Sequence, residues 1–406
     1  MTDRPLRILT VADVPADPNS GAAGKIVQSN RVLRELGHTV QELWSTDLGP
    51  RRIGHGNLHS LLEQPRRMRS AVLRAISSER LDVILSHQPQ SYLAAEACRR
   101  VGFPGRFFVV SQGVEARIAP ILTEWHRKLR VPQARFPQSL LSPWLQRRLL
   151  AQWPRACRAC DGVIVDNRED QDFVIENYDV PHDRTLVWPS GLPEEFLHDP
   201  PPMTRERLRR ILYVGQFAFY KGPHLLAEIV SQVLRSRPDM RMTWVCQAEH
   251  HEAARRLLSP DVHSQVEFRS WMPFAELRNL FDTHGLFLFP SIAEGFGRAA
   301  LEAMSRGLCV IASDGSGMRD YIESGVNGWL HPIGDISRFV TGTRSMADGF
   351  DLAATMSARA RVAASEFDWA VSVADLCSFL YRLPTASTSN KTTSIRDRQL
   401  SLRRQP

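Results

Sequence analysis

The sequence predicts an α/β protein built from two doubly wound, Rossmann-like domains that face each other across a cleft. Short apolar runs alternate with amphipathic stretches of helical length from the N-terminus to about residue 365, a pattern typical of parallel sheets covered by helices. The chain has 406 residues, more than a single hydrophobic core usually serves. A proline-rich segment, His198-Asp-Pro-Pro-Pro-Met, divides the pattern in two, because successive prolines continue neither a helix nor an internal strand.

The apolar runs locate the strands of each predicted sheet. In the first half the predicted strands are Arg7–Ala12, Thr39–Trp44, Asp82–Ser86, Phe107–Ser111, Gly162–Asp166 and Thr185–Trp188. In the second half they are Ile211–Gly215, Met242–Cys246, Val266–Arg269, Leu286–Pro290 and Cys309–Ala312. Ligands of open α/β sheets bind beyond the carboxyl ends of the strands, so the chemistry should face the cleft.

These patterns divide the chain into five parts. We expect a first domain over residues 1–197, a linker over 198–210 and a second domain over 211–365. A helix over 366–382 should pack back toward the first domain. Residues 383–406 are rich in Ser, Thr, Asn, Gln and Arg and hold too few apolar side chains for a core, which predicts a disordered basic tail.

The overall charge restricts the kinds of partner. The formal net charge is +7 and the pI is near 9.3, which favours nucleic acid, anionic membranes or phosphorylated substrates. No zinc finger, RNA-binding aromatic signature or helix-turn-helix pattern is present, so we expect no nucleic-acid partner. No run reaches the roughly 18 uncharged apolar residues that cross a bilayer. Six scattered cysteines indicate reduced thiols rather than a disulfide framework, and hence a cytoplasmic protein.

The most informative segment is FLFPSIAEGFGRAALEAMSRGLCVIAS, residues 287–313. It combines a buried strand, a polar loop with glycines, a helix and a second strand. Glu294 lies in the loop and Glu302 eight positions later on the helix. The helix N-terminus offers unpaired N–H groups to an anion, and carboxylates accept hydrogen bonds from neighbouring sugar hydroxyls. This arrangement indicates a nucleotide-sugar site.

At these residues the sequence resembles the group 1 family of retaining GT-B glycosyltransferases, whose signature is E-x7-E. Here the signature reads Glu294-Gly-Phe-Gly-Arg-Ala-Ala-Leu-Glu302. The resemblance extends in order through ILYVGQFAFYKGPHLL, FRSWMPFAELRNLFDTHGLFLFPS and RGLCVIASDGSGMRDYIESGVNGWLHPIGD, and therefore covers essentially the whole second half. It implies the GT-B fold, with an acceptor-side first domain and a donor-binding second domain.

The resemblance also implies roles for individual residues. Glu294 would hold hydroxyls of the donor sugar, and Glu302 would grip the ribose. Backbone amides near Phe296 and Gly297 would approach sugar and phosphate. Lys221, at the end of the loop that starts at Gly215, would neutralise the diphosphate as it leaves.

Two positions depart from the family pattern. Gln216 stands where an arginine usually partners the lysine, so one cation is missing unless Arg298 or another nearby cation compensates. Gln112, in Ser111-Gln112-Gly113-Val114-Glu115, stands where many relatives carry a histidine near the reacting carbon. His87, after a predicted strand, is a further candidate for the cleft edge or a structural histidine.

Two other loops are candidates for ligand contacts. The segment DVPADPNSGAAGK, residues 13–25, follows the first strand and opens a helix, and Gly21 and Gly24 could face the donor phosphate or the acceptor; it is otherwise a plain βα turn. It matches neither a P-loop nor G-x-G-x-x-G. Asp170-Gln-Asp172 resembles a metal-binding D-x-D, but it falls in the first turn of a predicted helix, where the helix dipole favours acids. We expect no metal and no cofactor.

Two stretches of the first domain, residues 58–76 and 125–153, interleave Arg and Lys with Leu and Trp. Such stretches are either ordinary surface helices packed on the sheet or segments that lie on an anionic membrane. In the second case the protein would be peripheral on the inner face of the membrane.

The leading hypothesis is a retaining glycosyltransferase that moves a sugar from a nucleotide-diphosphate-sugar donor to a glycan or lipid-linked acceptor. Two alternatives remain open: a GT-B nucleotide-sugar epimerase, and a catalytically weak nucleotide-sugar-binding subunit, which Gln112 and Gln216 would favour.

Overall fold

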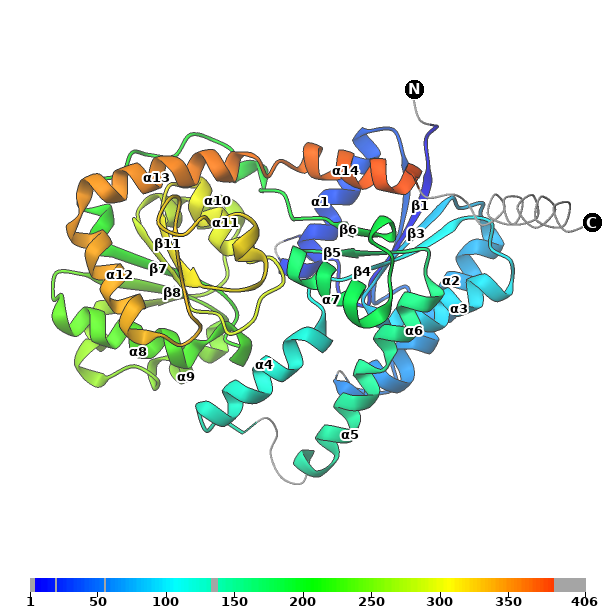
Figure 1. Cartoon of the computed structure of the whole chain (residues 1–406), viewed down its shortest axis with the longest axis horizontal. Helices are drawn as coiled ribbons and strands as arrows, with labels where there is room; N and C mark the ends of the chain where they lie inside the picture. The colour runs from blue at the N-terminus through cyan, green and yellow to red at the C-terminus, as the bar shows by residue number, and fades with distance from the viewer. Residues whose placement is uncertain (1–3, 19, 55, 133–137, 383–406) are drawn as a thin grey trace, which may run out of the picture.

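A computed structural model describes residues 4–18, 20–54, 56–132 and 138–382. The predicted basic tail, 383–406, lies outside these residues. Within them, no helix combines the length and the apolar character needed to cross a bilayer. Two lobes are visible, the second half of the chain on the left of Figure 1 and the first half on the right.

The first domain contains a six-stranded parallel sheet of order β2-β1-β3-β4-β5-β6. Its strands are β1 (Arg7–Val11), β2 (Thr39–Leu43), β3 (Val83–His87), β4 (Arg106–Val110), β5 (Gly162–Val165) and β6 (Thr185–Val187). Its helices are α1 (Gly21–Glu35), α2 (Gln64–Ser78), α3 (Tyr92–Arg100), α4 (Glu115–Lys128), α5 (Gln138–Leu150), α6 (Gln152–Ala159) and α7 (Arg168–Tyr178). The interior strands β3 and β4 are buried at every residue, as strands covered by helices on both faces must be.

The second domain repeats the architecture, with strand order β12-β11-β10-β7-β8-β9, again all parallel. Its strands are β7 (Arg210–Val214), β8 (Arg241–Val245), β9 (Val266–Arg269), β10 (Leu286–Phe289), β11 (Cys309–Ser313) and β12 (Trp329–His331). Its helices are α8 (Pro223–Ser236), α9 (His251–Arg255), α10 (Phe274–Asp282), α11 (Arg298–Ser305), α12 (Ile336–Asp348) and α13 (Phe350–Ser365). One continuous apolar core fills this domain.

The prediction of two doubly wound parallel domains is confirmed, and each of the eleven predicted strands is present with ends within one residue. The prediction missed β12, an edge strand of three residues that pairs only with β11. A strand this short lacks the alternation or the apolar run by which strands are recognised.

Two connections join the lobes. The segment after Phe196 is tied to the second domain, because the Arg207 guanidinium donates to the carbonyls of Pro201, His284 and Arg306. At the other end of the chain, α14 (Trp369–Arg382) leaves the second domain and packs against α1 in the core of the first (Figure 1). All six cysteines are buried, and none of them forms a disulfide.

Candidate functional site

The loop between β10 and α11 carries Glu294, a buried carboxylate that forms an ion pair with the partly buried Lys221. Lys221 Nζ lies 2.6 Å from Glu294 Oε1 and 2.8 Å from Oε2. Ser291 Oγ donates to Glu294 Oε1 at 2.7 Å. Glu294 is only 6% exposed, so desolvation strengthens these charge-assisted bonds. The two residues lie 73 positions apart in sequence, and the fold brings them together.

The turn that carries Lys221 is fixed to the Glu294 loop through the backbone. The carbonyl of Tyr220 accepts hydrogen bonds from the amides of Ile292 and Ala293 at 2.8 and 3.1 Å. Gly222 follows with φ of 66°, and a Cβ there would strike the carbonyl of Pro290. This close approach requires glycine, and it fixes the position of Lys221 relative to Glu294.

Gly215 and Gln216 lie at the start of the same turn. A Cβ at Gly215 would lie 2.5 Å from the hydroxyl of Tyr213. Gln216 accepts a hydrogen bond of 2.9 Å from the Tyr220 hydroxyl, which leaves its amide N–H₂ as the donor end. The side chain is thus positioned beside the lysine turn, but it brings no charge.

Glu302 lies on the second turn of α11 and is 6% exposed. Its Oε1 lies 3.5 Å from the Arg298 guanidinium. Burial raises the pKa of Glu302 to about 7, and the charge of Arg298 opposes this shift. The carboxyl group therefore changes its protonation state near neutral pH.

The loop glycines sit where other groups come close. Gly297 has φ of 84°, and a Cβ there would lie 2.8 Å from the sulfur of Met318. Phe296 is 4% exposed and packs on Tyr321, with ring centroids 5.2 Å apart. The phenyl ring therefore anchors the loop, and only the backbone of Phe296 remains for a ligand.

The first domain contacts this loop directly. A Cβ at Gly295 would clash with the carbonyl of Gln112, and Gln112 Nε2 donates to the carbonyl of Ala22 at 3.0 Å. Arg298 donates to the carbonyl of Gly21 at 2.9 Å. The candidate residues Gln112 and Gly21 therefore border the second-domain site.

The remaining two first-domain candidates play different parts. A Cβ at Gly24 would lie 2.5 Å from the carbonyl of Pro18 and 3.3 Å from Arg298, so glycine lets α1 approach the cleft. His87 is buried at the end of β3, and its Nδ1 has no hydrogen-bond partner among the described residues. Burial, assisted by the charge of Lys25, lowers the pKa of His87 to about 3, so the imidazole is neutral.

A cavity of about 180 Å³ lies between the domains beside the ion pair. Arg117 and Glu169 line it from the first domain, and Ser291 and Glu294 from the second. Arg117 lies 2.9 Å from Glu169 and also donates to Ser316 Oγ at 3.2 Å. Arg117 therefore bridges the two domains at the cavity.

Sequence reasoning missed several residues that shape the site. Asn167 donates to the carbonyl of Gly295 at 2.7 Å. Lys25 is 1% exposed, lies 2.5 Å from Asp166 and packs over the ring of Trp188, which fastens α1 to the carboxyl edge of the sheet. Of these residues, only Asn167 could have been recognised from the sequence, because Asn is favoured at helix N-caps. Its side chain accepts a hydrogen bond from the Asp170 N–H in the first turn of α7.

The D-x-D segment lies in the first turn of α7. Asp170 is fully buried and accepts from the Arg117 guanidinium at 2.6 Å, whereas Asp172 is exposed. No group of three or more His, Cys, Asp or Glu side chains suited to a metal ion occurs among the described residues.

Comparison with known proteins gives matches for both halves of the chain. The model described as "Glycosyltransferase Family 4" matches residues 27–196, and the model described as "Glycosyl transferases group 1" matches residues 208–348. A D-inositol 3-phosphate glycosyltransferase of Corynebacterium kroppenstedtii is 27% identical over 253 residues. That alignment covers 55% of each chain, so the match spans about half the length of this relative. A protein of the same name from Kribbella flavida is 25% identical over 90% of this chain and 93% of its own.

Solved structures share the fold. Sucrose-phosphate synthase from Thermosynechococcus elongatus superposes with a TM-score of 0.73 at 17% identity, over 93% of this chain and 98% of that one. Anabaena HepE in complex with UDP and glucose superposes with a TM-score of 0.65 at 18% identity, over 93% and 100%. Two matching family models, the E-x7-E loop and this two-domain fold lead to one conclusion. The chain belongs to the group 1 glycosyltransferases of GT-B architecture.

Proposed function

We propose that the protein transfers a sugar from a nucleoside-diphosphate-sugar donor to a hydroxyl of a glycan or lipid-linked acceptor, with retention of anomeric configuration. The observation that carries the proposal is the buried Lys221–Glu294 pair, which lies in the cleft beside the N-terminus of α11. A diphosphate here would meet a fixed cation and unpaired N–H groups, and both stabilise the charge that develops as the leaving group departs.

In this proposal Glu294 accepts hydrogen bonds from hydroxyls of the donor sugar. Both of its oxygens are already held by Lys221, and one also by Ser291. A carboxylate restrained in this way is suited to orient a sugar rather than to attack it. This supports retention by front-face attack without a protein nucleophile, as the family resemblance implies.

Glu302 is proposed to hold the ribose hydroxyls, and the backbone at Phe296 and Gly297 to approach the phosphates. The surroundings of Glu302 support its role, because its carboxylate lies 3.5 Å from the Arg298 guanidinium on the same helix. The site is proposed to work without a metal ion, since Lys221 and Arg298 supply the positive charge.

Arg298 is proposed to replace the cation that is missing at Gln216. It occupies the first position of α11, and its guanidinium lies between Glu302 and the carbonyl of Gly21. Arg298→Gln should then lower kcat, and adding Gln216→Arg should restore part of the loss. A double variant no better than Arg298→Gln would exclude this role.

The first domain is proposed to place the acceptor in the cavity beside Glu294, with Gln112 against the neighbouring Gly295. Solved relatives support a nucleotide donor, since the HepE structures contain UDP and UDP-glucose. The related D-inositol 3-phosphate glycosyltransferases indicate that acceptors with several hydroxyls are worth testing first. We propose that the protein acts in the cytoplasm.

The test is a thermal-shift panel of nucleoside diphosphates and nucleotide sugars on three proteins: wild type, Glu302→Ala and Glu276→Ala. Glu276 is an exposed acid on α10 and serves as the matched control. A ligand that binds only the native state raises Tm, so one nucleotide should shift wild type and Glu276→Ala but not Glu302→Ala. Absence of any shift at millimolar concentration would contradict the donor site.

A further inference from the structure

Helices α4 and α5 form an arm that stands away from the first sheet (Figure 1). No residue of α4 is buried, although a helix of a globular domain usually buries an apolar stripe. One side of α4 contacts the second domain, where the ring of His126 stacks on that of Phe219 with ring centroids 3.6 Å apart. The side that faces α5 lines a groove between the two helices.

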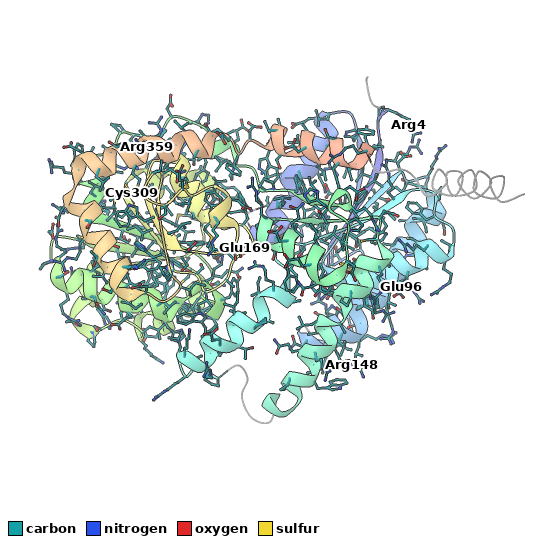
Figure 2. The ribbon with its side chains drawn as sticks, viewed as in Figure 1. Arg4, Glu96, Arg148, Glu169, Cys309 and Arg359 are labelled. Atoms are coloured by element: carbon teal, nitrogen blue, oxygen red, sulfur yellow. The ribbon has the colours of Figure 1, made fainter. Side chains whose placement is uncertain are left out.

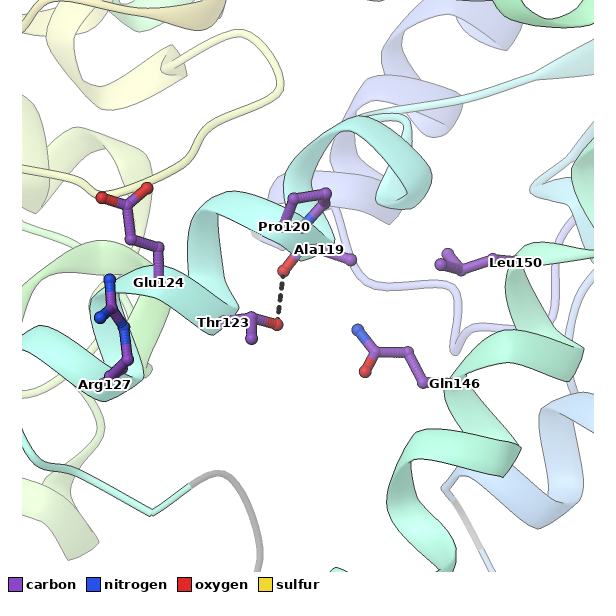
Figure 3. A pocket seen from close by; sticks show the side chains of 7 residues that line it. All are labelled: Ala119, Pro120, Thr123, Glu124, Arg127, Gln146 and Leu150. Atoms are coloured by element: carbon purple, nitrogen blue, oxygen red, sulfur yellow. Dashed lines mark hydrogen bonds between the residues drawn. The ribbon is translucent and has the colours of Figure 1, made fainter.

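An apolar groove of about 480 Å³ lies between the two helices. Figure 3 shows the seven residues that line it, Ala119, Pro120, Thr123, Glu124 and Arg127 on α4 and Gln146 and Leu150 on α5. Thr123 donates to the carbonyl of Ala119 at 2.9 Å, which removes its hydroxyl as a polar group within the groove. Although Glu124, Arg127 and Gln146 also line the groove, most of its exposed lining surface is apolar.

Large apolar side chains are also exposed on α5 and on the segment that packs against it. Trp144 on α5 is 54% exposed. Leu58 and Leu62, at the start of the helical segment that leads into α2, are 51% and 42% exposed, and this segment packs against α5. The groove, Trp144 and these leucines therefore give exposed apolar surface on and around α5, of the kind that marks a binding site.

The same end of the domain is strongly basic. Residues 115–150 contain seven arginines and lysines against two glutamates. Within the described part of the chain, Arg127, Arg147 and Arg148 are exposed and none forms an ion pair with a carboxylate. The guanidinium of Arg148 lies 5.5 Å from the centroid of the Trp144 ring. Exposed tryptophan and unpaired arginine on adjacent turns suit the interface of an anionic bilayer.

We propose that the α4–α5 arm, with the exposed leucines beside it, docks the protein on an anionic lipid surface. An acidic protein face would also attract the arginines, but it would leave the apolar groove, Trp144 and the leucines exposed to water. A bilayer interface offers partners for both at once, anionic headgroups for the guanidinium groups and acyl chains for the apolar side chains.

The arm also orients the catalytic cleft toward the lipid. Arg117, in the first turn of α4, lines the cavity that contains Glu294, whereas Lys128 ends the helix after fourteen residues. At ~1.5 Å per residue, Arg117 at the cavity stands about 16 Å from Lys128 at the outer end of α4. This separation suits an acceptor whose sugar projects from a lipid anchor. That reading of the acceptor rests on the proposed function, whereas the docking itself does not.

The experiment is co-sedimentation of the full chain with vesicles of phosphatidylcholine alone or with 30% phosphatidylglycerol, at about 50 and 300 mM salt. The test variants are Arg147→Glu/Arg148→Glu and Trp144→Ser. The control is Arg344→Glu/Arg359→Glu, which makes the same change in net charge on exposed residues of the second domain. Arg148 and Arg359 lie at opposite ends of the molecule in Figure 2. Thermal melts of all variants establish that they are folded.

Wild type and the control should bind anionic vesicles, with binding weaker at high salt. The arginine variant should bind at least about tenfold less, since each basic residue near an anionic surface contributes about 1 kcal/mol, and Trp144→Ser should also bind less. Equal binding of the two double variants, or no binding of wild type to anionic vesicles at low salt, would overturn the proposal. If vesicles bind but no nucleotide sugar is consumed, the proposed function fails and the docking surface stands.

Discussion

Gly295→Ala tests whether the contact between the domains sets the geometry of catalysis. Gly295 lies between Glu294 and Phe296, and a Cβ there would lie well inside 3.0 Å of the Gln112 carbonyl oxygen and 2.9 Å from its carbon. Real Cβ atoms do not approach backbone this closely. The φ of Gly295 is not in the left-handed region, so the effect of the substitution is steric and not conformational.

The magnitude follows from this clash. Restoring an ordinary separation requires the loop and the Gln112 strand end to move apart by close to an ångström. A displacement of about 1 Å at a reacting centre costs on the order of 100-fold in rate, equivalent to about 2.7 kcal/mol of transition-state stabilisation. Unfolding should be affected less, because separation of the domains relieves the clash without opening a core.

The assay is steady-state transfer kinetics together with thermal unfolding. Gly54→Ala is the matched control, because a Cβ at Gly54 meets nothing within 4 Å. Gly295→Ala should lose about 100-fold in kcat/KM while its Tm stays within a few degrees. If Gly295→Ala retains wild-type kcat/KM, close contact between Gln112 and the Glu294 loop is not needed for catalysis.

Three further predictions concern single charged groups. Burial raises the pKa of Glu302 from 4.5 to about 7, so the folded state loses stability as pH rises through that window. Glu302→Gln should therefore add about 2 kcal/mol to the free energy of unfolding at pH 8. Nucleotide affinity should rise from pH 6 to 8 in wild type and stay constant in the variant. Denaturant titration and calorimetry measure these two effects, and a variant no more stable than wild type at pH 8 would contradict them. Lys25→Met leaves Asp166 buried without its cation and should cost about 3–5 kcal/mol in urea unfolding, most of it recovered in Lys25→Met/Asp166→Leu; a neutral Lys25→Met would show that the pair contributes little. Lys221→Met removes the cation at Glu294 and should lower kcat by roughly 100- to 1000-fold, and a loss confined to KM would instead mean that Lys221 only binds the donor.

Most of the fold was predictable because parallel strands buried on both faces appear as uninterrupted apolar runs. β3 and β4 are buried throughout, and so are β10 and β11, which flank the E-x7-E segment. The uninterrupted apolar runs that this burial requires were the signal that identified these strands in the sequence. β12 escaped because an edge strand of three residues carries no comparable signal.

The candidate site was predictable only where a motif exists. Glu294 and Glu302 share one loop and helix, so their spacing carried information. Lys221 was identified only through the family resemblance, and its ion pair with Glu294 was not predicted, since nothing in the local sequence relates residues 73 positions apart. Ser291 and Asn167 were missed because small polar residues acquire a role only from the neighbours that the fold gives them.

Arg298 illustrates the same limit. From the sequence, Arg298 could be recognised only as a cation near the start of the helix that carries Glu302. Its contact with the carbonyl of Gly21, 277 positions away, appears only when the two domains are assembled. The charged residues near a cleft can therefore be identified from the sequence, but the position of each charged group depends on how the two domains pack.

The central claim is tested most directly by proton NMR of wild type and Lys221→Met incubated with the α-linked nucleotide sugar whose nucleotide stabilises the protein. Wild type should release the nucleoside diphosphate, and the sugar it transfers to an acceptor, or more slowly to water, should first appear as the α anomer, while Lys221→Met should be nearly inactive. A first-formed β anomer would contradict retention, and an intact donor after prolonged incubation with a range of hydroxyl acceptors would contradict the assignment of the cleft as a transferase site.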